Sequence, residues 1–111
     1  ALVLLNETGF VEASRALAQR VLLEGGAGDE ARIRELHLLT VGREPDAAER
    51  EVVAALVARE RARFAAQPED AAALISVGES ARDESIEPVE HAAWTLAAAL
   101  MLNLSETVTR G

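Results

Sequence analysis

The feature that most constrains the fold is an apolar run near the carboxyl terminus. It extends from Ala92 to Leu102, and Thr95 is its only polar residue. Ala and Leu favour helix, Pro88 suits a first helical turn, and a helix that is apolar on all sides is surrounded by other elements. We therefore predict an all-α fold, a compact array of four to six helices, with this Ala/Leu-rich helix buried at its centre. Trp94 and Met101 are expected to fill the gaps that its alanines leave.

Residues 10–24 carry an apolar stripe at helical spacing, which predicts an amphipathic helix. The stripe consists of Phe10, Ala13, Leu17 and Val21. The polar residues between them, Glu12, Arg15 and Gln19, are expected to face away from the core. A glycine cluster at 25–28 ends this helix, and a second helix is predicted to start with Asp29 as its cap and to end near Gly42.

A long third helix is predicted after the turn at 43–46. Pro45 suits its first turn, and Asp46 and Glu49 have the spacing of a capping box. The helix is expected to run to about Ala66, and its inward side consists of Val53, Leu56, Val57 and Phe64. Pro68 starts a short fourth helix over roughly 69–77. The acidic segment 78–87 has no periodicity and is predicted to be a solvated loop.

Length and charge limit what the chain can do. We predict a single helical domain over residues 1–111, and a fragment of a larger protein, because the chain starts without Met in an apolar stretch. Its 19 acidic and 11 basic residues give a formal net charge of -8, which repels the phosphates of nucleic acid. The run at 92–102 is too short to span a bilayer, and the chain carries no recognisable export signal.

Few residues offer metal or cofactor chemistry. There is no cysteine, and the two histidines, His37 and His91, fall on different predicted helices. His91 follows Glu87 and Glu90, so one turn could present an imidazole and a carboxylate to a cation, but a zinc site needs three or four protein ligands. We therefore predict that His91 is a surface or boundary residue, that Met101 is a core residue rather than a haem ligand, and that no cofactor or metal is bound.

Asn6 and Asn103 both stand where a helix is expected to end. Each begins a match to the glycosylation sequon, a three-residue pattern that arises often by chance. Capping of the helix ends by the two side chains is the simpler role.

Several short segments together resemble the carboxy-terminal part of a bacterial family of unknown function, planctomycete-specific domain one. The resemblance covers nearly the whole chain. The matching pieces, in chain order, are Leu4-Leu5-Asn6, Ala16-Leu17-Ala18 with Arg20, Gly42-Arg43-Glu44-Pro45 with Glu49, Ala92-Ala93-Trp94, and Leu102-Asn103-Leu104 with Glu106. His37 stands where an aromatic residue such as Tyr is expected, which favours a packed role for it.

The resemblance implies the tail of a large exported protein, periplasmic or extracellular, that also carries a cytochrome-c-like module. The resemblance implies no catalytic residues, because none is established for the family. From the residues themselves, Arg43 is placed to pair with Glu49 across the capped turn or with Glu106.

Two functions from different classes fit these observations. The first is a non-catalytic helical module that packs against other domains of an exported multidomain protein, which an exposed apolar patch near Ala1–Val3 would support. The alternative is a contribution to the active site of an exported redox or polysaccharide-degrading enzyme, which would require a pocket with apolar walls. Weak self-association through the Ala-rich helices is a third possibility. The residues that could serve a structural or binding role are Arg43, Glu49, His91, Trp94, Asn103 and Glu106.

Overall fold

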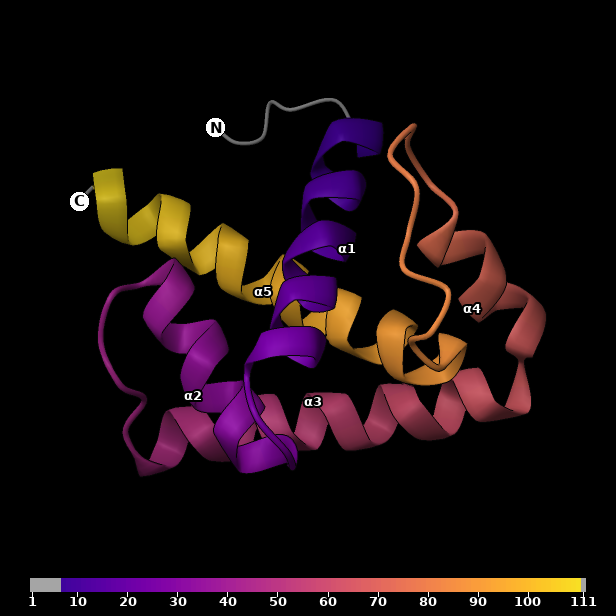
Figure 1. The fold of residues 1–111 in the computed structure, drawn as a ribbon. Coiled ribbons are helices and arrows are strands. Elements are labelled where there is room, and N and C mark those ends of the chain that lie inside the picture. The colour runs from indigo at the N-terminus through magenta and orange to yellow at the C-terminus, as the bar shows by residue number, and fades with distance from the viewer. Residues whose placement is uncertain (1–6, 111) are drawn as a thin grey trace.

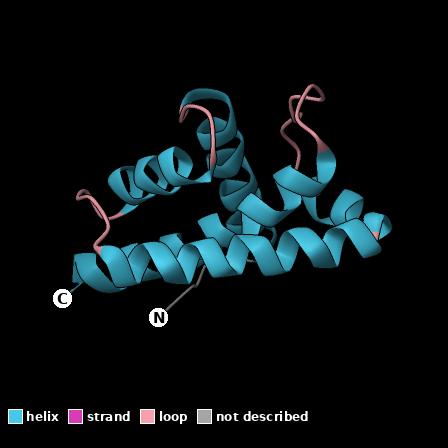
Figure 2. Ribbon diagram, turned by 90° about the horizontal axis from the view of Figure 1, so that it is seen from below, coloured by secondary structure: helices cyan, strands magenta, loops and turns pink. Residues whose placement is uncertain are grey.

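Five α-helices make up the part of the chain that the computed structural model describes, namely the backbone of residues 7–110 and the side chains of residues 8–105 (Figure 1). They are α1 (Glu7–Glu24), α2 (Asp29–Thr40), α3 (Ala47–Ala66), α4 (Pro68–Ile75) and α5 (Pro88–Arg110). No strand occurs within this range, as the colouring of Figure 2 shows. The predicted all-α array of four to six helices is confirmed.

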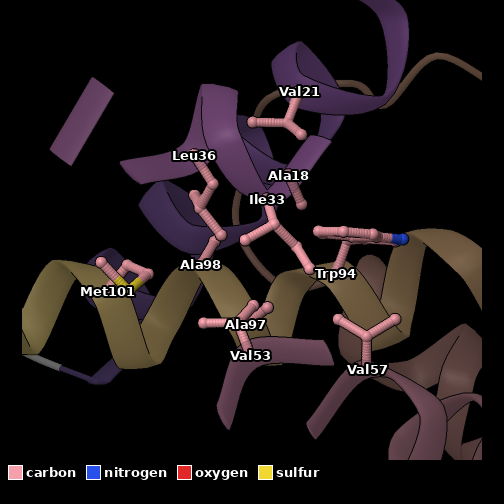
Figure 3. Packing of buried hydrophobic residues seen from close by; sticks show 10 residues of the cluster. All are labelled: Ala18, Val21, Ile33, Leu36, Val53, Val57, Trp94, Ala97, Ala98 and Met101. Atoms are coloured by element: carbon pink, nitrogen blue, oxygen red, sulfur yellow. The ribbon is translucent and has the colours of Figure 1, made fainter. Parts of the chain in front are cut away.

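Helix α5 lies at the centre, as predicted, and each of the other four helices contacts it. Its alanines allow the neighbouring helices to approach closely, while Trp94 and Met101 are buried and fill the space between them. Figure 3 shows these two side chains among apolar residues of α1, α2 and α3. The partners in this core are Ala18, Val21, Ile33, Leu36, Val53 and Val57. The central helix is thus held by apolar contacts along most of its length.

The ends of α2 and α3 differ in part from the prediction. The capping box of α3 is confirmed, since Asp46 accepts from the Glu49 backbone N–H at 2.8 Å. Pro45, however, precedes this cap and lies outside the helix, so its predicted place in the first turn was wrong. Asp29 is not the cap of α2 either: Gly28 has that position, and the Asp29 carboxylate instead pairs with Arg61 of α3.

The buried face of α1 is rotated from the predicted stripe. Ala13 is exposed, whereas Ser14 and Arg15 are buried, with Arg15 only 2% exposed. The prediction that Arg15 faces away from the core was therefore wrong. The physical reason is that this face also covers the segment between α4 and α5, whose carbonyl groups the guanidinium satisfies.

The carboxy-terminal end of α5 extends beyond the predicted boundary. The helix continues to Arg110, so Asn103 lies within it, and the prediction of a helix end at Asn103 was wrong. Asn6 and the side chain of Glu106 lie outside the described residues. Among the described helices, none has the length and apolar character needed to cross a membrane.

Candidate functional site

A half-open pocket of about 310 Å³ lies between the carboxy-terminal end of α2, the first half of α3 and the second half of α5. Its walls are mainly apolar, and the apolar side chains that the argument uses are Val41, Val52, Leu100, Met101 and Leu104. We call this site the apolar pocket. Its polar lining consists of His37, Arg43 and Glu49. A volume near 300 Å³ is at the lower end of the range for ligand and side-chain binding sites.

The rim of the apolar pocket exposes two large apolar side chains. Val52 on α3 is 60% exposed and Leu104 on α5 is 45% exposed. Among the described residues the third exposed large apolar side chain is Leu23, which lies on α1 and does not line this pocket. Residues 1–3, where an apolar patch was expected, lie outside the described part. The exposed apolar surface that the structure describes is instead formed by the pocket and its rim on α2, α3 and α5.

Arg43 and Glu49 form a closed ion pair at the edge of the pocket, as predicted. The two guanidinium Nη atoms donate to the two carboxylate oxygens at 2.7 and 2.6 Å. The backbone N–H of Asp46 also donates to Glu49 at 2.9 Å. The Arg43 hydrogen bonds, followed by this backbone contact, lower the pKa of Glu49 to about 2. Glu49 is therefore a permanent anion with occupied oxygens, which suits a structural pair and not a general acid or base near neutral pH.

His37 lines the apolar pocket and is buried, which confirms that it is a packed residue. Burial lowers its pKa, so the imidazole is neutral at neutral pH. Its Nδ1 has no hydrogen-bond partner among the described residues. The sequence reasoning predicted a packed role for His37 but missed its position in the wall of a pocket.

His91 lies in a second polar site, and the prediction that it is a surface or boundary residue was wrong. It is fully buried, and its two ring nitrogens have separate partners. Nε2 is 3.0 Å from the backbone oxygen of Arg15, and Nδ1 accepts from Nε of Arg82 at 3.2 Å. Burial lowers the pKa of His91, and the nearby Arg82 and Arg15 cations add to the effect.

The carboxylates near His91 in sequence are engaged elsewhere. Glu87 accepts from the backbone N–H groups of Val89 and Glu90 at the start of α5. The Glu90 carboxylate pairs with Arg61 at 2.8 Å. The imidazole and carboxylates thus do not gather around a cation, and no group of three or more His, Asp or Glu side chains in the described range is placed to hold a metal ion.

Residues 76–87, which join α4 to α5, form a tethered segment that we call the strap. Arg15 donates to the backbone oxygens of Val77 and Ser80 at 3.0 and 2.7 Å, and to the Ser80 hydroxyl at 3.0 Å. Glu12 accepts from the Ser80 N–H at 2.8 Å, and Gln19 accepts from the Asp83 N–H at 2.9 Å. The segment is a loop with exposed acidic side chains, as predicted, but the sequence did not reveal that three polar side chains of α1 hold it.

The remaining candidates lie apart from both sites. Trp94 is fully buried in the central core, and its Nε1 has no hydrogen-bond partner among the described residues. Asn103 is exposed on α5 and does not line the apolar pocket. The structure therefore brings together Arg43 and Glu49 from the predicted set, and it adds Val52, Leu100 and Leu104. None of these three apolar residues was singled out as a site residue from the sequence, although Leu100 belongs to the apolar run at 92–102.

Comparison with known proteins gives a match to a protein family. The family model of PSD1, a protein of unknown function (DUF1553), matches residues 1–57 of the chain. This range covers α1, α2 and the first half of α3, including the Arg43–Glu49 pair. No curated protein and no solved structure matches the chain. The predicted resemblance is confirmed over the amino-terminal half, and for residues 92–94 and 102–106 it stays a prediction.

Proposed function

Since this chain belongs to PSD1, a family of proteins of unknown function, we propose a role from its geometry: it is a non-catalytic helical module that packs against another domain of the same protein through the apolar pocket. The observation that carries the proposal is the exposed apolar rim. Val52 and Leu104 are both exposed, and both line a pocket whose walls are mainly apolar. Contiguous apolar patches on the surface of a domain often mark interaction sites, whereas single exposed apolar residues are ordinary.

The proposed occupant is an amphipathic helix with a continuous apolar face and basic flanks. A groove between helices accepts an apolar helix face through residues spaced at i, i+3 and i+4. Basic flanks are favoured because the chain carries a net charge of -8, which attracts a cationic partner during encounter. The same charge makes a second copy a poorer partner, since two copies repel each other.

Burial of the two rim side chains would make a measurable contribution to binding. Full burial of a Val or Leu side chain contributes about 1.5–3 kcal/mol, and Val52 and Leu104 are about half buried already. Each therefore contributes roughly 1 kcal/mol when a partner covers it. A polar substitution at either position should remove this gain without unfolding the domain.

A role in catalysis has less support. The alternative function requires polar groups that are free to act within an apolar pocket. The Glu49 carboxylate instead accepts hydrogen bonds from Arg43 and from the Asp46 backbone N–H. His91 does not line the pocket and lies in the separate site beside the strap. We therefore keep the packing module as the proposed function.

Site-specific photo-crosslinking in the full-length parent protein tests the proposal. A photoreactive phenylalanine derivative replaces Val52 or Leu104, and Leu23 provides the matched control because it is equally exposed on α1. We expect positions 52 and 104 to crosslink to one amphipathic helix of another domain, and position 23 to give no such product. Peptide mass spectrometry identifies the partner residues.

Other outcomes would contradict the proposal in distinct ways. Crosslinks from position 52 to a second copy would favour self-association, and equal crosslinking from position 23 would show that the pocket has no special role. As a second measurement, calorimetry of this chain with the separately produced remainder of the parent protein should give a negative heat-capacity change, as burial of apolar surface requires. Val52→Asp should weaken that binding about tenfold or more, whereas Leu23→Asp should leave it unchanged.

We also propose that the parent protein is exported to the periplasm or out of the cell. The support for it is the resemblance alone. Fractionation of cells that produce the parent protein with its native amino terminus tests this part, and recovery only from the cytoplasm would contradict it.

A further inference from the structure

The strap and His91 suggest a second property, independent of the apolar pocket. Residues 76–87 are held from two sides: by Glu12, Arg15 and Gln19 of α1, and by His91 of α5 through Arg82. Arg82 also donates to the backbone oxygen of Ile86 within the strap. The closed position of the strap therefore rests on its hydrogen bonds to α1 and on one bond to a buried imidazole.

Hydrogen-bond chemistry fixes the protonation state of that imidazole. The Nε of an arginine is always a donor, so the His91 Nδ1 that faces it must accept with a free lone pair. Nε2 then carries the proton and donates to the backbone oxygen of Arg15. A second proton on Nδ1 would face the Nε–H of Arg82 directly, so the Arg82 bond and a doubly protonated His91 exclude each other.

The surrounding charges oppose the protonated form as well. The charged groups that act on His91 are Arg15 of α1 and Arg82 and Asp83 of the strap. Asp83 is the only anion of the three, and its carboxylate already accepts from the N–H and hydroxyl of Ser85. An imidazolium at this buried position would be repelled by the Arg82 and Arg15 cations.

We infer that the strap is loosened by acid: when His91 takes up a proton at Nδ1, Arg82 leaves it, and residues 76–87, then held by their α1 contacts alone, open more readily while the five helices stay folded. Opening uncovers the polar side chains of α1 and removes one wall of the hollow of about 400 Å³ that Ser80 and Arg82 border beside α4. The step takes one proton from solvent and breaks no covalent bond.

The direction of the pH effect follows from the histidine. Burial lowers the pKa of His91 below the ordinary value of 6.5, so the folded, closed state binds this proton less well than the open state does. The closed strap is therefore stable at neutral pH, and its stability falls as the pH drops below about 6.5. Glu12 and Asp83 have lowered pKa values and do not titrate in this range.

Hydrogen exchange of backbone amides, read by NMR as protection factors, tests the inference. Between pH 7.5 and 5 the amides of Ser80 and Asp83, which are bonded to α1, should lose protection at least tenfold. The amide of Val57 in the core of α3 should keep its protection. In His91→Gln this pH-dependent loss should disappear, and in His37→Gln, which removes the other buried histidine, it should remain.

Three results would overturn the inference. One is a loss of protection that persists in His91→Gln, and another is simultaneous loss in the strap and in α3, which would mean global unfolding. The third needs no variant and so applies even if His91→Gln fails to fold: nitrogen chemical shifts of the unaltered protein at pH 7.5 that place the proton of His91 on Nδ1 instead of Nε2.

Discussion

Replacement of Arg15 by Met is the sharpest test of how the strap is held. Met keeps an unbranched apolar side chain in the buried position but removes the guanidinium and its three hydrogen bonds. The backbone oxygens of Val77 and Ser80 lose their donors. Glu12, whose carboxylate lies 3.8 Å from the guanidinium, loses its nearest cation.

The expected loss is about 3 kcal/mol in the free energy of unfolding. A hydrogen bond to a charged group contributes about 1.5–3 kcal/mol, and removal of one member of a buried charged pair costs about 3–5 kcal/mol. The lower figure applies because Glu12 is partly exposed and the strap can loosen to let water reach the freed oxygens. A domain of this size has about 5–15 kcal/mol of stability, so the variant should still fold.

Urea denaturation followed by circular dichroism measures the change. With a slope of roughly 1–3 kcal/mol per M, the midpoint of Arg15→Met should fall by roughly 1–3 M. Arg20→Met is the matched control: Arg20 lies on the same helix in a mostly exposed pair with Glu24, and pairs of this kind contribute less than about 1 kcal/mol. If Arg15→Met lies within about 0.5 kcal/mol of the unaltered protein, the strap contacts do not contribute to stability as argued.

Three further substitutions test the turns and the ion pair. Arg43→Gln should raise the pKa of Glu49 from about 2 toward its usual range, as measured by carbon NMR titration of the carboxyl group. A carboxyl group whose pKa is lowered in the folded state stabilises the fold at pH values above its pKa in the unfolded chain, and this stabilisation is lost as the pH falls through the folded-state pKa. The difference in stability between this variant and the unaltered protein should therefore vanish as the pH falls toward 2. Gly78→Ala should cost about 1–2 kcal/mol for its positive φ and about 1 kcal/mol more in lost hydrogen bonding, because the added Cβ collides with Glu12. Gly42→Ala has a positive φ but open space around it, so thermal unfolding should show the smaller loss.

The helices could be predicted because local patterns determine them. The apolar run at 92–102 identified the central helix, since no exposed helix tolerates apolar residues on every side. The capping box of α3 was found because its two residues are only three positions apart. The single-position errors at Asp29 and Pro45 have the same origin: several residues near a helix start can serve as caps, and tertiary contacts decide among them.

The polar network of the strap could not be predicted from the sequence. Arg15 and its acceptor in Ser80 are separated by 65 positions, and His91 and its Arg15 acceptor by 76. Periodicity assigns a charged residue to the solvent by default, because a buried charge is rare without partners. The partners here belong to a segment with no periodicity of its own, so only the folded arrangement reveals them.

The apolar pocket could not be predicted from the sequence either, apart from the ion pair at its edge. The Arg43–Glu49 pair is local and follows from the capped turn. The walls come from α2, α3 and α5, and their separation depends on how these helices pack. A hollow is a property of that packing, which no single segment encodes.

The two sites are anchored at different points of α5, and this allows their separate roles to be tested in one molecule. His91 holds the strap, and Met101 lines the apolar pocket. Ten helical positions separate them, or about 15 Å along the axis. Perturbations at such a distance with no shared partner add within about 0.5 kcal/mol. Arg15→Met should therefore leave binding at the pocket unchanged, and a larger effect would mean that α5 couples the strap to the interface.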